Sequence, residues 1–168
     1  MKSTGEVLGL STDYEEALLK GLYASGVRNY RGTGVFISVS NNYKEEILPI
    51  AKELTRMGCK LYASVGTAQA LEKDGTYAEV VGKLTQCDDI NRLIRSGSVK
   101  IIINTPTKGR DSRSDGFKIR RMAVEQGATC FTSLDTAAAF VRALKLGKTD
   151  KELSLCSLKE VERINATE

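Results

Sequence analysis

The residues best suited to chemistry form the segment Ser64-Val65-Gly66-Thr67, which directly follows a short apolar run. A glycine at such a turn lets the backbone approach a ligand closely, and the N–H groups that open a following helix attract anions. Ser64 and Thr67 would add hydroxyl donors, while Lys44 and Lys83 would supply positive charge. The pattern favours capture of a phosphate group without a metal. Gly, Ser and Thr are also common in ordinary strand-to-helix turns, so a purely structural interpretation stays open.

A second polar segment, residues 104–116, contains no expected helix or strand. It holds Asn104, Thr105 and Asp115 together with several lysines and arginines. Structureless loops of this length are usually functional or disordered. Two interpretations follow: a flap that a ligand orders over the phosphate site, or a solvated loop leading into a charged helix.

Several reaction classes are excluded or disfavoured by what the sequence lacks. The chain contains no histidine, so every mechanism with an imidazole base, acid or metal ligand is excluded. Neither GxxxxGK[ST] nor GxGxxG occurs, which disfavours a P-loop and a dinucleotide site. The four cysteines form no CxxC pair, which argues against structural zinc and thioredoxin-like redox chemistry. Reduced cysteines make a cytoplasmic location the expectation.

An alternating series of strands and helices must position these residues. Short apolar runs predict five strands, at residues 35–39, 60–63, 77–81, 99–103 and 128–132. Helical periodicity fills the intervals, precedes the first strand and follows the last. This alternation specifies an α/β fold, a three-layer α/β/α sandwich with a five-stranded parallel sheet. Ligands bind such sheets at the carboxyl ends of the strands, where both polar segments begin.

Local signals predict where the helices start. Thr12 with Glu15, and Asn42 with Glu45, have the spacing of capping boxes. Pro49 would then lie beyond the first turn of the second of these helices, so we expect that helix to bend. The segment after residue 147 is expected to hold at most one short helix.

Size and composition fit a single globular domain with short flanking segments. The chain has 168 residues, of which 41% are hydrophobic and 27% charged. These values exclude disordered and collagen-like chains, and no apolar run approaches the ~20 residues of a membrane span. The net charge of +4 is too small to argue for nucleic acid and suits small anionic ligands.

Three sequence segments carry a family resemblance. They are residues 102–109, Asp115-Gly116-Phe117-Lys118-Ile119-Arg120-Arg121 and Thr132-Ser133-Leu134-Asp135-Thr136. Through them the chain resembles, over residues 1 to about 146, the carboxyl-terminal allosteric domain of the carbamoyl-phosphate synthetase large subunit. That domain has the methylglyoxal-synthase-like fold. The opening residues look like the end of a preceding synthetase unit, so we expect a fragment of a longer protein.

The resemblance implies a domain organisation and a function. Residues 1–30 would be the junction with the preceding synthetase unit, residues 31–147 the regulatory domain and residues 148–168 a tail. The regulatory domain would be non-catalytic and would need no cofactor. It would bind UMP as inhibitor, and IMP or phosphoribosyl pyrophosphate as activator. Implied partners are the rest of the large subunit and the glutaminase small subunit, with a homo-oligomer as a further expectation. The parent ligase, which uses ATP and Mg, would serve pyrimidine and arginine biosynthesis.

The resemblance also implies roles for individual residues. The family's phosphate-site lysine falls on Lys44, and its Thr-x-Gly-Thr motif falls on Ser64, Gly66 and Thr67. Its second lysine falls on Lys83. The ligand-loop residues fall on Asn104 and Thr105, and the aspartate that can hold a ribose hydroxyl falls on Asp115. Serine replaces the usual threonine at position 64 but keeps the hydroxyl.

Two alternative functions remain. The first is a methylglyoxal-synthase-like lyase, which would need a carboxylate base near the substrate phosphate and which uses a histidine in that family. The nearest candidate bases, Asp88 and Asp89, are better placed as helix N-terminal partners. The second is a structural docking or oligomerisation domain, in which Val7, Leu8 and Leu10 would form an interface.

Overall fold

The computed structural model describes residues 5–27, 31–82, 88–106 and 114–165, and contacts divide the chain into two compact units. One unit spans residues 30–138, and the other combines residues 1–29 with 139–168. The division between them falls inside helix α6 (Leu134–Lys145). Within the second unit, Arg142 near the end of α6 pairs with Glu15 at 3.6 Å.

Five parallel strands form the sheet of the 30–138 unit, as predicted. Their order across the sheet is β3-β2-β1-β4-β5. Their bounds are Gly34–Ser38 (β1), Lys60–Ser64 (β2), Glu79–Val81 (β3), Val99–Asn104 (β4) and Thr129–Phe131 (β5). From β1 the chain first adds strands on one side and then, with β4, on the other. The carboxyl ends of β1 and β4 therefore flank the switch point at which open α/β sheets bind ligands.

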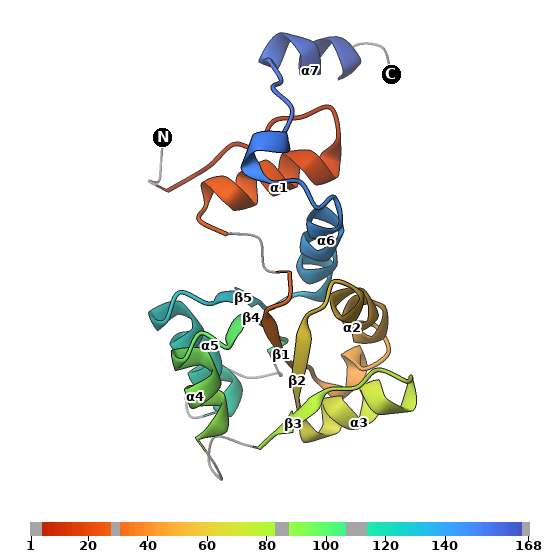
Figure 1. The fold of residues 1–168 in the computed structure, drawn as a ribbon, viewed down its shortest axis with the longest axis vertical. Helices are drawn as coiled ribbons and strands as arrows, with labels where there is room; N and C mark the ends of the chain where they lie inside the picture. The colour runs from red at the N-terminus through yellow and green to blue at the C-terminus, as the bar shows by residue number, and fades with distance from the viewer. Residues whose placement is uncertain (1–4, 28–30, 83–87, 107–113, 166–168) are drawn as a thin grey trace. The chain divides into compact units, whose positions relative to one another are not determined.

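Helices cover both faces of this sheet, which confirms the three-layer architecture (Figure 1). Alternate strand residues such as Phe36, Tyr62 and Ile102 share one buried cluster with α4 (Asp89–Arg95) and α5 (Asp115–Glu125). Because strand side chains alternate between faces, their neighbours point the other way. That second face packs on α2 (Ile47–Arg56) and α3 (Val65–Lys73), both of which contact β2.

A glycine is required where β1 begins. A Cβ atom at Gly34 would lie 2.1 Å from the carbonyl oxygen of Ser98, and Gly34 N donates to that same oxygen at 3.0 Å. The ladder between β1 and β4 also shifts register between Gly34 and Val35. The backbone at Gly34 lies so close to the backbone at Ser98 that any residue with a Cβ atom would clash there.

The first helix starts one residue later than the sequence pattern suggested. Asp13, not Thr12, is the N-cap of α1 (Tyr14–Ala24), and its carboxylate accepts a hydrogen bond from Glu16 N at 2.8 Å. The predicted capping box of Thr12 with Glu15 is therefore wrong. An aspartate in the next position supplies the same acceptor with a charge that favours a helix N-terminus.

The second predicted capping box is also wrong. Asn42 lies within a short 3-10 helix, Asn41–Tyr43, and α2 begins only at Ile47, without a side-chain cap. Pro49 consequently lies in the first turn of α2, where its missing N–H has no helical partner to lose. The premise for a bend at this proline does not hold.

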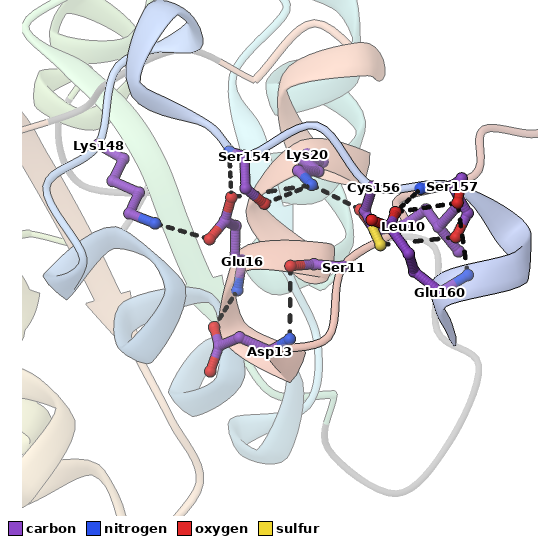
Figure 2. Close-up of polar contacts among 10 residues, drawn as sticks. All are labelled: Leu10, Ser11, Asp13, Glu16, Lys20, Lys148, Ser154, Cys156, Ser157 and Glu160. Atoms are coloured by element: carbon purple, nitrogen blue, oxygen red, sulfur yellow. Dashed lines mark hydrogen bonds and ion pairs between the residues drawn. The ribbon is translucent and has the colours of Figure 1, made fainter. Parts of the chain in front are cut away.

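The unit built from both ends of the chain is centred on Glu16 of α1. Its carboxylate accepts hydrogen bonds from Lys148 Nζ at 2.6 Å and from Ser154 N at 2.5 Å, as Figure 2 shows. Lys20 Nζ lies 3.7 Å from Glu16 Oε1. Only 5% of Glu16 is exposed. The hydrogen bonds from Lys148 and Ser154 lower the pKa of Glu16 to about 2. Glu16 thus binds the segment after α6 to α1.

The same unit ends in more regular structure than we expected. A 3-10 turn, Asp150–Glu152, is followed by helix α7 (Leu158–Asn165). Ser157 N and Oγ both donate to the Glu160 carboxylate, which gives α7 a capped start. Val7 and Leu8, which we considered as interface residues, are 49% and 75% exposed.

Candidate functional site

A cavity of about 300 Å³ opens at the carboxyl edge of the sheet, where both polar sequence segments were predicted to meet. The first turns of α3 and α5 form parts of its wall. The lining residues are Phe36, Ser38, Ser64, Val65, Gly66, Val81, Gly82, Asp115, Gly116 and Ile119. Of the predicted site residues, Ser64, Gly66 and Asp115 are therefore in the cavity wall.

The first turn of α3 faces this space with little side-chain cover. Ser64 holds the N-cap position in an extended conformation and makes no capping hydrogen bond with its side chain. Gly66 is exposed, and a Cβ atom there would meet only Lys44 Nζ, at 3.9 Å. The helix thus presents its first N–H groups, which carry the positive end of the helix dipole, to the cavity.

Lys44 supplies the positive charge beside this turn. Its ammonium group donates to Thr67 Oγ1 at 2.6 Å and to the carbonyl oxygen of Val39 at 2.8 Å. Partial burial lowers the pKa of Lys44. Among the described residues no carboxylate pairs with it, so an anion at Gly66 would find a cation held only by neutral oxygens.

Thr67 organises this corner from below the cavity wall. The side chain is fully buried, and its hydroxyl also accepts from Val39 N at 3.3 Å. Lys44 is a second donor to this hydroxyl oxygen, and Ser64 Oγ donates to it at 3.1 Å. The lone pairs of Ser64 Oγ are not used in this contact, and Ser64 itself lines the cavity. Thr67 therefore acts as a positioning residue, and Ser64 is the hydroxyl within reach of a ligand.

Asn104 and Thr105 hold the end of β4 against the end of β1. Asn104 Nδ2 donates to the carbonyl oxygen of Ser38 at 3.2 Å, and Thr105 Oγ1 accepts from Ser40 N at 3.1 Å. Both residues are buried, with 4% and 5% exposed. They lie behind the cavity rather than in its wall.

The first turn of α5 forms the opposite side of the cavity. Ser114 caps it by accepting from Phe117 N at 3.3 Å, and Asp115 and Gly116 follow in the wall. Two helix starts thus border one cavity, with a lysine beside one of them and a carboxylate beside the other. This arrangement can hold an anionic group at α3 and a hydroxyl-bearing group at Asp115.

The structure thus gathers most of the predicted residues around one space. Lys83 lies outside the described residues, as does most of the expected flap between Pro106 and Ser114. Sequence reasoning missed Gly116 in the wall and Arg120, whose guanidinium donates to Asn104 Oδ1. The run of charges around Arg120 was visible in the sequence, but nothing local distinguished it from Arg121.

The described residues contain no group of three or more Cys, Asp or Glu side chains arranged to hold a metal ion. In the same ranges, the helices lack the combined length and apolar character that crossing a bilayer requires.

Comparison with known proteins agrees with this architecture. Methylglyoxal synthase from Elizabethkingia anophelis NUHP1 superposes with a TM-score of 0.54 at 15% sequence identity. The match covers 73% of this chain and 81% of that one, and at this identity it establishes the fold alone. The family model described as "MGS-like domain" matches residues 46–132, just over half of the chain and most of the sheet. The chain is therefore a member of the MGS-like domain family.

Proposed function

We propose that this chain is a non-catalytic effector-binding domain of a carbamoyl-phosphate synthetase large subunit, located in the cytoplasm. It would bind the phosphate of UMP, IMP or phosphoribosyl pyrophosphate at the α3 turn and shift the parent enzyme between states. The single observation that carries the proposal is the cavity at the carboxyl edge, with Lys44 beside the exposed turn at Gly66.

The geometry supports a phosphorylated ligand in two ways. The cation, the Ser64 hydroxyl and the open N–H groups converge at one end of the cavity. Asp115 lies in the opposite part of the wall, on α5, where a carboxylate would accept hydrogen bonds from sugar hydroxyls. A cavity of about 300 Å³ is at the small end of the usual range for ligand sites.

Two observations favour a lyase as second candidate: the likeness to methylglyoxal synthase, and the Asp115 carboxylate in the cavity wall. Against it stands the absence of histidine from the whole sequence. A shared fold does not carry its chemistry from one protein to another. Release of methylglyoxal and inorganic phosphate from a triose phosphate would favour the lyase.

The proposal is tested by calorimetric titration of the chain with UMP, IMP and phosphoribosyl pyrophosphate, and with uridine as the phosphate-free probe. We expect saturable binding of at least one phosphorylated probe and none of uridine. Lys44→Gln and Ser64→Ala should each weaken binding about 10-fold or more, because each removes a hydrogen bond to a charged group, worth ~1.5–3 kcal/mol.

Lys52→Gln is the matched control for charge. Lys52 lies on α2 and pairs with Asp74 at 2.8 Å, outside the cavity wall. Lys52→Gln should leave the affinity for the phosphorylated probes unchanged. If folded protein binds none of the phosphorylated probes, or if Lys52→Gln weakens binding as much as Lys44→Gln, the proposed site is refuted.

A further inference from the structure

Arg120 reaches from α5 to the end of β1 through one intermediate side chain. Its Nη1 donates to Asn104 Oδ1, and Asn104 Nδ2 donates to the carbonyl oxygen of Ser38 at 3.2 Å. Arg120 is half-buried and has no carboxylate partner within the part of the chain that the structure describes. Its hydrogen-bond partner there is the neutral amide of Asn104.

These two contacts leave the Asn104 amide only one orientation. A guanidinium can only donate and a main-chain carbonyl can only accept. Turning the amide over would place N–H groups against Arg120 and the amide oxygen against the Ser38 oxygen. Without Arg120, the Asn104 oxygen would lose its donor in a residue that is only 4% exposed. A buried acceptor without a partner is costly, so the amide would leave its present position.

The pair lies directly behind the cavity wall. A Cβ atom at Gly116, a lining residue, would be 3.2 Å from both Arg120 Nη1 and Asn104 Oδ1. Such a distance is tighter than ordinary carbon contacts, so only a glycine leaves the pair undisturbed. The position of the cavity wall at the start of α5 therefore depends on the positions of the Arg120 and Asn104 side chains.

We propose that Arg120 is a positioning residue for ligand binding, acting through the Asn104 amide and not on the ligand itself. By fixing that amide it joins the first turns of α5 to the end of β1 and sets the wall that contains Asp115 and Gly116. The inference rests on the proposed function, namely that this cavity binds a nucleotide phosphate.

The test compares Arg120→Met and Arg120→Lys with Arg121→Met, all in the full chain. Arg121 is the matched control because it is the next residue, it pairs with Glu125 at 2.8 Å, and its side chain is 72% exposed. UMP, IMP and phosphoribosyl pyrophosphate are titrated into each. The two side-chain amide signals of Asn104, identified by their loss in Asn104→Ala, are followed by ¹H–¹⁵N NMR.

We expect Arg120→Met to weaken binding of the tightest-binding probe roughly 10- to 100-fold and to move the Asn104 signals, because the buried Asn104 oxygen loses its charged donor and the cavity wall is displaced with it. Arg120→Lys should recover most of the affinity, because an ammonium group can still donate to Oδ1. Arg121→Met should change neither affinity nor the Asn104 signals. If Arg120→Met does not fold, Gly116→Ala takes its place, because a Cβ 3.2 Å from Arg120 Nη1 and Asn104 Oδ1 requires the pair to shift slightly without removing a polar group. Its readout is movement of the Asn104 signals together with weaker binding.

Other results overturn the inference. Unchanged affinity in Arg120→Met refutes it while leaving the proposed function intact. Weakened affinity with unmoved Asn104 signals shows that the arginine acts on the ligand directly. Wild-type protein that binds none of the three probes refutes the proposed function, and this inference with it.

Discussion

The buried hydroxyl of Thr67 accepts hydrogen bonds from Val39 N and Lys44 Nζ, and Thr67→Val tests whether it organises the site. Valine has nearly the same shape, so the change removes the oxygen without opening a cavity. Val39 N, on a residue that is 6% exposed, would lose its partner at 3.3 Å, and Lys44 would lose its contact at 2.6 Å.

The expected cost follows from these contacts. A buried N–H without a partner costs about 1–3 kcal/mol. The lost bond from Lys44 adds less than its full value, because the half-buried lysine keeps the Val39 carbonyl at 2.8 Å. We therefore expect Thr67→Val to lower the free energy of unfolding by about 2–4 kcal/mol. Thr67→Ser, which keeps the oxygen, should lose only about 1 kcal/mol for the missing methyl group.

The assay is denaturant unfolding followed by circular dichroism, with Thr55→Val as the control. The Thr55 hydroxyl donates only to the carbonyl of Ala51, one turn earlier in α2, at 3.0 Å. Its loss should cost less than about 1 kcal/mol, because that carbonyl still accepts the ordinary helical hydrogen bond. If Thr67→Val is no more destabilising than Thr55→Val at equal m-value, Thr67 does not organise the site.

Three further predictions concern parts of the chain outside the cavity. Because the pKa of Glu16 is lowered from 4.5 to about 2, its contribution to stability is complete above pH 4.5 and is lost as the pH falls towards 2. Glu16→Gln should therefore reduce the fall in melting temperature between pH 6 and pH 3, whereas Glu72→Gln on the exposed face of α3 should not. Gly34→Ala should lower the free energy of unfolding by about 3 kcal/mol or more, because its Cβ would lie 2.1 Å from the carbonyl oxygen of Ser98. Thermal melts would measure this loss. Gly21→Ala, in α1 with no atom closer than 3.8 Å, should instead raise the unfolding free energy by ~0.5–1 kcal/mol in the same melts.

The sheet could be predicted from the sequence because its signals are local. The unbroken run Ile101-Ile102-Ile103 belongs to a strand with neighbours on both sides and helices on both faces, which requires apolar side chains at every position. The helix starts were less predictable. Several neighbouring polar residues satisfy a capping pattern, and the backbone direction at each position decides which one caps, as the shift from Thr12 to Asp13 illustrates.

The candidate site could be predicted only in outline. Position after a strand was enough to find Ser64 and Gly66, and the family resemblance indicated Asp115. It did not separate residues that face the cavity from residues that hold its wall, such as Thr67 and Asn104. That distinction depends on contacts across 23 and 16 positions of sequence, between Lys44 and Thr67 and between Asn104 and Arg120. A local sequence pattern does not indicate contacts between residues so far apart in the sequence.

The unit formed by residues 1–29 and 139–168 has a consequence for the order of folding during synthesis. Its anchor, Glu16, is made 132 positions before Lys148 and 138 before Ser154. The ribosome therefore delivers the whole sheet while α1 still lacks its partners. All five strands belong to the 30–138 unit, so we expect the sheet to form before α1 finds its partners at the far end of the chain. A chain truncated before residue 148 would lack both Lys148 and Ser154, and α1 would then lack these two hydrogen bonds to Glu16.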